Sequence, residues 1–247
     1  MKIVVAPNYK LADIQQFLEN IQAQGKVEYQ GRNTIKSLRV ADQNWNVKIF
    51  RLPHLINAIV YRYFRASKAQ RSFDYAHILL DKGFNTPCPI AYAEQRSFWR
   101  ITHSYYISEH IESDLSLHTL KMDIDYPDRT NILQQFIEFT YHLQMSGIYF
   151  MDHSPGNTLI VKQSEGQYRF YLVDLNRIKF GPLSYQTRIK NFTRLSATDE
   201  MLEIMAEKYA QLCGSDFQQT YADILKACHT VAAKRTRKQQ LKKKFLG

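Results

Sequence analysis

Asp152 and Asn157 stand five positions apart in the stretch MDHSPGNTLIV, directly before a run of mostly β-branched residues. An acid and an amide at this spacing match the D-x-x-x-x-N pattern of a phosphoryl-transfer loop. In that chemistry the carboxylate orients a hydroxyl and accepts its proton, and the amide oxygen is a neutral ligand for Mg²⁺. Pro155 and Gly156 predict a turn between them, and an ordinary turn is the simpler interpretation, because Asp and Asn favour turns.

Two further residues could complete such a site. Asp174 follows the apolar run FYLV, where a second metal ligand would bridge Mg²⁺ to nucleotide phosphates. Lys48 interrupts the apolar stretch VKIF, and a lysine that faces inward from a strand needs an anion nearby, here the α- and β-phosphates. An acid on a helix should pair with Lys48. Asp74 and Asp81 are the nearby candidates, and Asp74 is our prediction because it lies in the middle of the expected helix.

Two other stretches are candidates for contacts with ATP. The turn YQGRN places Gly31 and Arg32 where they could cover the phosphates. The aromatic run YYISEHI is predicted to connect two lobes, and backbone groups near Glu109 and Ile111 would then meet the adenine.

Each of these residues has a commoner explanation when it is taken alone. Lys48 could be a surface lysine on an edge strand, Asp174 could be a turn or cap residue, and D-x-x-x-x-N occurs by chance. Their order along the chain is what favours a kinase. A hydrolase triad of Asp152, His153 and Ser154 is excluded, because adjacent side chains cannot converge in the required geometry.

The predicted elements fit this interpretation. Strands are expected at residues 1–6, 26–30, 34–40 and 45–50, helices at 13–21 and 68–82, and a further helix that ends at Gly147. TLIV and RFYLV should form a hairpin with SEG in its turn, and the chain is helical from about Leu195. We therefore predict an α+β, protein-kinase-like bilobed fold with a strand-rich N-lobe at 1–110 and a helical C-lobe at 111–247.

Composition limits the class of protein. The 247 residues are 45% hydrophobic and suit one large domain or two lobes. Lysine and arginine number 33 against 23 acids, a formal charge of +10, which indicates an anionic partner without naming it. Three cysteines without metal-like spacing favour a reducing compartment. No apolar run suits a secretory signal or a membrane span, so we expect a cytoplasmic protein.

Six segments carry a family resemblance, and their order is more specific than any one of them. They are YQGRNTIKSL, NVKIFRLPHLINAIVYRYFRASKAQRSFDYA, GFNTPCPIAY, YYISEHIES, DHSPGN and LVDLNRIKF. The chain resembles the bacterial lipopolysaccharide kinase family, which phosphorylates Kdo or heptose sugars of the inner core. The resemblance implies a protein-kinase-like fold, ATP with Mg²⁺ as cofactors, and a sugar hydroxyl on a lipid-linked acceptor.

The chain also departs from the protein-kinase pattern. Phe150 and Met151 precede Asp152 where protein kinases carry His-Arg, and Ser154 stands where they carry Lys. G-x-G-x-x-G and A-P-E are absent. These differences favour a small-molecule or glycolipid kinase over a regulated protein kinase. A soluble sugar, an aminoglycoside or a protein as acceptor, and a catalytically weak pseudokinase-like scaffold, are the alternatives.

The C-terminal residues 234–244 are strongly basic and could be a solvated helix end or a contact with an anionic membrane surface. Residues 54–65 mix apolar, aromatic and basic side chains and could be a second membrane contact, which we favour, or part of the ordinary packing of the lobe. Such contacts would place the protein on the inner face of the inner membrane. No nucleic-acid partner is expected, and the sequence does not determine the oligomeric state.

Overall fold

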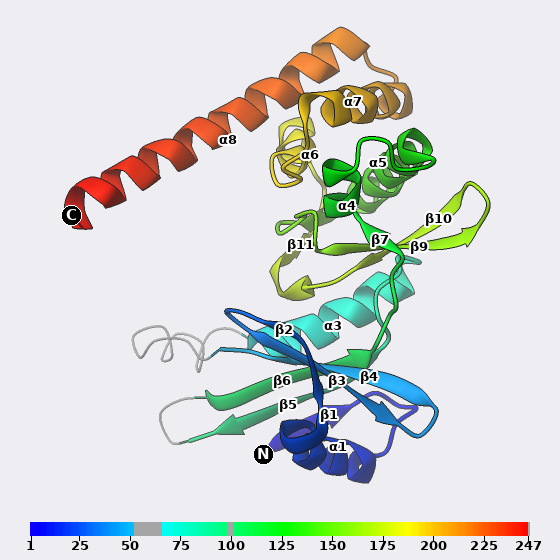
Figure 1. The fold of residues 1–247 in the computed structure, drawn as a ribbon, viewed down its shortest axis with the longest axis vertical. Coiled ribbons are helices and arrows are strands. Elements are labelled where there is room, and N and C mark those ends of the chain that lie inside the picture. The colour runs from blue at the N-terminus through cyan, green and yellow to red at the C-terminus, as the bar shows by residue number, and fades with distance from the viewer. Residues whose placement is uncertain (52–65, 98–100, 247) are drawn as a thin grey trace. The chain divides into compact units, whose positions relative to one another are not determined.

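The computed structural model describes residues 1–51, 66–97 and 101–246, and side chains as far as residue 241. The stretch 54–65, with its predicted membrane contact, lies outside the described residues. The chain forms two compact units (Figure 1). Unit 1 comprises Met1–Glu112 and Val173–Asn176, and unit 2 comprises Ser113–Leu172 and Arg177–Gly247.

Unit 1 is built on one antiparallel sheet of six strands, in the order β1-β5-β6-β4-β3-β2. Its strands are β1 (Lys2–Val5), β2 (Lys26–Gln30), β3 (Thr34–Val40), β4 (Gln43–Ile49), β5 (Pro89–Arg96) and β6 (Ile101–Glu109). Its helices are α1 (Leu11–Gln24) and α3 (Lys68–Asp81).

The core of unit 1 follows from the periodicity of α1 and the alternation of β4. Ile14, Phe17 and Ile21 form the buried face of α1 and belong to one apolar cluster with Trp45 and Val47. Because β4 alternates, Lys48 points to the face opposite Val47, so it lies outside this cluster.

Unit 2 is mainly helical, with short strands between its helices. Its helices are α4 (Leu117–Met122), α5 (Arg129–Met145), α6 (Tyr185–Phe192), α7 (Asp199–Cys213) and α8 (Phe217–Leu246), with a 3-10 turn η1 (Leu175–Arg177) at the boundary of the two units. Its strands are β7 (Leu115–Ser116), β8 (Ile148–Phe150), β9 (Thr158–Ser164), β10 (Gln167–Leu172) and β11 (Ile178–Phe180). The core gathers apolar faces of α5, α6 and α7 around Phe136, Phe192 and Tyr209.

The strands β8 and β11 are each three residues long and pair antiparallel, with Phe150 opposite Ile178. Gly147 precedes β8 and Gly181 follows β11, and the Gly181 amide donates to the Gly147 carbonyl at 2.8 Å. The chain passes from β11 to α6 through only residues 181–184. The loop from Asp152 to Asn157, predicted to act in phosphoryl transfer, follows the other end of β8.

Most predicted elements are present. The strands at 26–30 and 34–40 have the expected bounds, the helix at 68–82 is α3, and the expected hairpin is β9 and β10. The short strands β7, β8 and β11 were not anticipated, because two or three residues carry no detectable alternation. In the part of the chain that the structure describes, no helix is both long and apolar enough to cross a membrane.

Gly147 should be required for stability. Its φ of +73° is one that side chains other than glycine rarely adopt, and a Cβ there would lie 3.0 Å from the Gly181 carbonyl oxygen. We expect Gly147→Ala to lower the free energy of unfolding by about 1–3 kcal/mol. Gly156→Ala is the matched control, because a Cβ there meets nothing within 4 Å. Urea denaturation of both variants measures the difference, and equal stabilities would contradict the expectation.

Candidate active site

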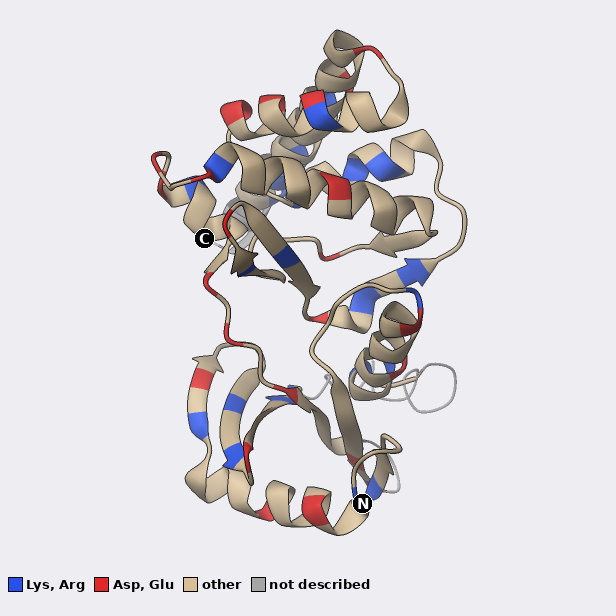
Figure 2. Cartoon of the chain, turned by 90° about the vertical axis from the view of Figure 1, so that its right-hand side faces the viewer, with Lys and Arg blue, Asp and Glu red and all other residues tan. Residues whose placement is uncertain are grey.

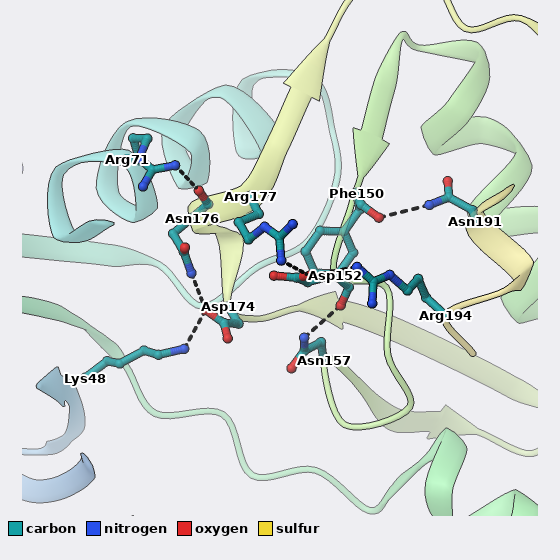
Figure 3. A network of polar contacts seen from close by, with 10 residues as sticks. All are labelled: Lys48, Arg71, Phe150, Asp152, Asn157, Asp174, Asn176, Arg177, Asn191 and Arg194. Carbon is teal, nitrogen blue, oxygen red and sulfur yellow. Dashed lines mark hydrogen bonds and ion pairs between the residues drawn. The ribbon is translucent and has the colours of Figure 1, made fainter. Parts of the chain in front are cut away.

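Lys48 and Asp174 form an ion pair inside unit 1. The Lys48 ammonium lies 2.6 Å from Asp174 Oδ1, and the side chains are 14% and 29% exposed, respectively (Figure 3). The Lys48 ammonium also lies 5.6 Å from the centre of the Phe50 ring. Two residues predicted from the sequence to act on the nucleotide are therefore in direct contact.

The backbone conformation of Asp174 and a hydrogen bond from Asn176 orient the Asp174 carboxylate. Asp174 has a φ of +61°, a left-handed conformation that Asp tolerates better than most residues. The Asn176 amide donates to Oδ1, the same oxygen that meets Lys48. Within the described residues no hydrogen bond reaches Oδ2. One carboxylate oxygen is thus held by the protein, and the other is available to a ligand.

Arg71 of α3 fixes this segment to the rest of unit 1. Its Nη1 donates to the Asn176 carbonyl at 2.6 Å, and its Nε donates to the Ser67 carbonyl at 3.3 Å. Arg71 is buried, so these carbonyls satisfy a charge that would be costly alone. Ser67 also caps α3 by accepting from the Gln70 amide. The N-terminal turn of α3 therefore positions the residues that follow Asp174.

Further cations lie near the Lys48–Asp174 pair. Burial lowers the pKa of the Lys68 ammonium, and the charge of Arg32 lowers it further. Arg71 and Lys48 act in the same direction, and Asp174 opposes them. Positive charge thus exceeds negative charge in this part of unit 1, as a polyphosphate site requires.

The structure corrects one expectation. Lys48 pairs with Asp174, and among the described residues it makes no ion pair with Asp74. Burial raises the pKa of the Asp74 carboxyl. A hydrogen bond with Gln70 and the nearby charges of His77 and Lys2 lower this pKa by a smaller amount. The helical acid is present, but its interactions are with residues other than Lys48.

At the end of β6, two backbone amides already donate hydrogen bonds within unit 1. The Glu109 amide donates to the Cys88 carbonyl at 2.9 Å, and the His110 amide donates to the Asn44 carbonyl at 2.8 Å. The Ile111 amide makes no backbone hydrogen bond within the described residues. A contact with an adenine donor or acceptor would therefore use the Ile111 amide or a carbonyl, not the Glu109 amide.

Unit 2 holds the loop from Asp152 to Asn157. The Asp152 carbonyl accepts from the Ser154 amide at 2.6 Å and from the Asn157 Nδ2 at 2.7 Å (Figure 3). Because only the NH₂ group of Asn157 can donate to a carbonyl, this contact fixes the orientation of the amide. The Asn157 Oδ1 makes no hydrogen bond within the described residues and is available as a ligand.

Two arginines hold the Asp152 carboxylate. Arg177 Nη1 lies 2.9 Å from Oδ1, and Arg194 Nη2 lies 4.0 Å from the same oxygen (Figure 3). The Asp152 side chain is 22% exposed and both arginines are largely exposed, so these ion pairs orient the carboxylate more than they stabilise the fold.

A series of buried, hydrogen-bonded side chains holds the backbone directly before the loop. The Phe150 carbonyl accepts from Asn191 Nδ2 at 2.9 Å, and Asn191 Oδ1 accepts from Gln144 Nε2 at 3.1 Å. The Tyr209 hydroxyl donates to Gln144 Oε1 at 2.7 Å. These side chains come from α6, α5 and α7. They hold β8 at Phe150, which stands where the H-R-D motif of protein kinases has its histidine.

His153 lies between the rings of Phe136 and Phe150, with ring centres 5.1 and 5.5 Å away. It is fully buried, and burial lowers its pKa to about 4. Neither ring nitrogen has a hydrogen-bond partner within the described residues. His153 is therefore a neutral packing residue under the loop, in agreement with the exclusion of a hydrolase triad.

Each unit offers one oxygen that suits a hard cation. Asp174 Oδ2 and Asn157 Oδ1 are oxygen donors of the kind that Mg²⁺ prefers. No group of three or more His, Cys, Asp or Glu side chains suited to a metal occurs among the described residues. Mg²⁺ needs few protein ligands where substrate phosphates and water complete its coordination.

Sequence reasoning missed the residues that orient the site. Arg71, Arg177, Arg194 and Asn191 act through contacts with residues far away in the chain. The sequence signal was weak: Asn176 and Arg177 follow Asp174 directly, but nothing in their spacing indicates a partner. Gly31, Arg32, Glu109 and Ile111 remain predicted nucleotide contacts.

The sheet of unit 1, the helices of unit 2 and the loop from Asp152 to Asn157 define a phosphotransferase of the protein-kinase-like class. A model of the lipopolysaccharide kinase (Kdo/WaaP) family matches residues 18–242, and the chain belongs to this family. The predicted family, fold class and enzyme class are thereby confirmed.

The structure of WaaP supports the same fold, and a second solved structure is less similar. The chain is similar to WaaP in complex with acyl carrier protein, with a TM-score of 0.65 and 18% identity over 95% of this chain and 99% of that chain. A microcompartment-associated aminopropanol kinase matches with a TM-score of 0.49 and 12% identity over 82% of this chain and 81% of that one. No curated protein matches the sequence.

The buried His153 should make the fold sensitive to acid. Its pKa is lower in the folded chain, about 4, than the ordinary 6.5, so the unfolded chain binds the proton first as the pH falls. Stability should therefore fall between pH 6.5 and pH 4, by up to about 3 kcal/mol from this residue.

His153→Leu should remove this part of the acid sensitivity, and His142→Gln, at an exposed histidine, should not. Urea denaturation across this pH range gives the slope of the unfolding free energy against pH for each protein. A His153→Leu slope identical to that of the wild type would contradict the assignment.

Proposed function

We propose that this lipopolysaccharide kinase transfers the γ-phosphate of ATP, bound with Mg²⁺, to a hydroxyl of a Kdo or heptose sugar on lipid A. The observation that carries the proposal is the Lys48–Asp174 pair, in which one carboxylate oxygen remains available. A lysine and a carboxylate in contact, at the predicted positions, are the groups that phosphate and its metal ion need.

The roles of the residues follow from their available atoms. Lys48 would bind the α- and β-phosphates, with Arg32 and Lys68 adding positive charge nearby. Asp174 and Asn157 would hold the metal ion through Oδ2 and Oδ1. When bound, Mg²⁺ neutralises charge on the phosphates during transfer.

Asp152 would orient the acceptor hydroxyl and take up its proton. Its Oδ1 is held by Arg177, so Oδ2 is the oxygen left to meet the hydroxyl. Gly31 would let the turn approach the phosphates closely, and the backbone at Glu109 and Ile111 would contact the adenine. Asp74 has no role in this scheme, because it does not reach Lys48.

The acceptor is assigned through the family, whose name specifies lipopolysaccharide. A soluble sugar, an aminoglycoside or a protein could use the same phosphate-binding residues. A catalytically weak scaffold is the remaining alternative. The presence of Lys48, Asp152, Asn157 and Asp174 together supports an active enzyme.

Binding of MgATP should depend on Asp174. A non-hydrolysable ATP analogue at about a hundredfold excess over its Kd should raise the melting temperature by about 5–10 °C, and only with Mg²⁺ present. Asp174→Asn should abolish the shift, since Asn tolerates the left-handed backbone but weakens the metal ligand. Asp125→Asn, at an exposed position, is the control. A full shift in Asp174→Asn would remove this residue from the site.

Turnover should depend on Asp152. Asp152→Asn should lower kcat by about 10²–10⁴-fold with little change in the KM for ATP, because the carboxylate acts on the hydroxyl. Radiolabelled phosphate transfer to Kdo–lipid A, measured beside soluble sugars and an aminoglycoside, gives both the rate and the acceptor class. Wild-type kcat in the variant would exclude Asp152 as the base.

We also propose that α8 contacts the anionic inner face of the inner membrane. Basic positions occur on both units (Figure 2), but the described end of α8 concentrates four exposed ones at Lys234, Arg235, Arg237 and Lys238. Each basic residue near an anionic bilayer contributes about 1 kcal/mol at the surface. This position would bring the enzyme to a lipid-linked sugar.

Replacing these four residues by Gln should weaken binding to phosphatidylglycerol vesicles by about 10²–10³-fold. Exchanging each Lys for Arg and each Arg for Lys should preserve binding, because the charge is kept. Sedimentation with anionic and neutral vesicles measures the effect. Loss of binding to acyl carrier protein, with vesicle binding intact, would instead assign this surface to the partner seen with WaaP.

A further inference from the structure

Unit 2 contains an open pocket beside the strand β11. Its volume is about 340 Å³, and its polar lining comes from Tyr149 on β8, Lys179 on β11, and Thr187 and Lys190 on α6. The turn at 181–183 between β11 and α6 forms the rest of the wall. All of these residues belong to unit 2, so the pocket is a feature of this unit alone.

The pocket has two cationic side chains without a carboxylate partner. Neither Lys179 nor Lys190 makes an ion pair within the described residues, and both are exposed. The hydroxyls of Tyr149 and Thr187 add neutral hydrogen-bonding groups. A concave surface with two free ammonium groups and two hydroxyls is suited to an anionic group such as a carboxylate or a phosphate.

The pocket is connected through β11 to a residue that binds Asp152. Arg177, which pairs with Asp152, immediately precedes β11, and Lys179 lies two residues later. Lys179 in turn lies opposite Tyr149 on β8, the strand that leads to Asp152.

A second connection runs along the end of α6. Lys190 lies in the last turn of α6, and Arg194 follows four residues later, where it reaches Asp152 at 4.0 Å. Burial raises the pKa of the Tyr149 hydroxyl, and the charge of Arg194 opposes this. The strands β8 and β11 and the end of α6 thus each connect the lining of the pocket to residues around Asp152.

We propose that this pocket binds an anionic group of the acceptor and so positions the acceptor hydroxyl at Asp152. The inference rests on the proposed function, because it assigns the acceptor side of the same reaction. Lys179 and Lys190 act as binding residues, and the anion is a sugar carboxylate or a phosphate carried by the same acceptor. The nucleotide phosphates are assigned other contacts, Lys48 and Asp174 of unit 1.

The first test measures acceptor kinetics on the full chain. Lys179→Gln combined with Lys190→Gln should raise the KM for Kdo–lipid A by about a hundredfold, about tenfold for each charge-assisted contact, with kcat changed less than about threefold. The KM for ATP should not change. The double Arg variant should restore most of the affinity, because it keeps the charge.

The matched control removes the same charge elsewhere on unit 2. Lys162 and Lys226 are exposed and lie outside the pocket, so their double Gln variant should retain the wild-type KM. An equal rise in KM in this control would show a general effect of net charge and would overturn the proposal. So would a KM change for ATP, which would assign the pocket to the nucleotide.

The second test identifies the anion by altering the acceptor. Kdo–lipid A with its carboxyl converted to a methyl ester, and the same acceptor without its lipid A phosphates, are compared with the parent. Removal of the group that the pocket binds should raise the wild-type KM but leave the KM of the Lys179→Gln, Lys190→Gln variant unchanged. If neither change distinguishes the variant from the wild type, the pocket binds no acceptor anion.

A binding measurement separates this inference from the proposed function. Calorimetric titration of detergent-solubilised Kdo–lipid A, without ATP, should show binding to the wild type and about a hundredfold weaker binding to the Lys179→Gln, Lys190→Gln variant. This result would support the pocket even if no phosphate transfer were found. Phosphate transfer with equal binding to both proteins would support the function and overturn the pocket, and absence of binding to the wild type would overturn the pocket directly.

Discussion

The contact between Lys48 and Asp174 is the constraint around which the candidate site residues of unit 1 are arranged. A lysine that points away from an apolar cluster with 14% exposure must meet a negative charge, and the chain supplies one from a segment far away in sequence. Arg71 and the left-handed backbone at Asp174 serve the same contact, because they fix the segment that carries the carboxylate. The first turn of α3 is thus coupled to a metal-ligand candidate.

Asp152 in unit 2 is held in a similar way to Asp174 in unit 1. Cations occupy one oxygen of the carboxylate, and buried side chains hold the backbone around it. In both units one oxygen is engaged by the protein and the other is open to a ligand. The chain of hydrogen bonds from Phe150 through Asn191 and Gln144 to Tyr209 is neutral and buried, so it is insensitive to ionic strength, unlike the arginines above it.

The sequence predicted the parts of the fold and site that depend on local pattern. The alternation around Lys48 and the spacing of Asp152 and Asn157 are visible in the chain, and so are most helices and strands. The partner of Lys48 was chosen by its position on a helix, but pairing depends on tertiary placement, and Asp174 occupies that place. Arg177 ends a 3-10 turn and Arg194 follows α6, so no sequence pattern marks either as a partner of Asp152. The strands β8 and β11 beside the pocket have three residues each, which is too short to produce a pattern.

The connection of only four residues between β11 and α6 has a consequence for control of the enzyme. Many kinases are switched on when a phosphate orders a long segment after the metal-binding aspartate. Residues 181–184 offer no comparable length, and the Gly147–Gly181 hydrogen bond already holds them in place. An activation segment of the protein-kinase kind, ordered by an added phosphate, therefore has no counterpart between β11 and α6.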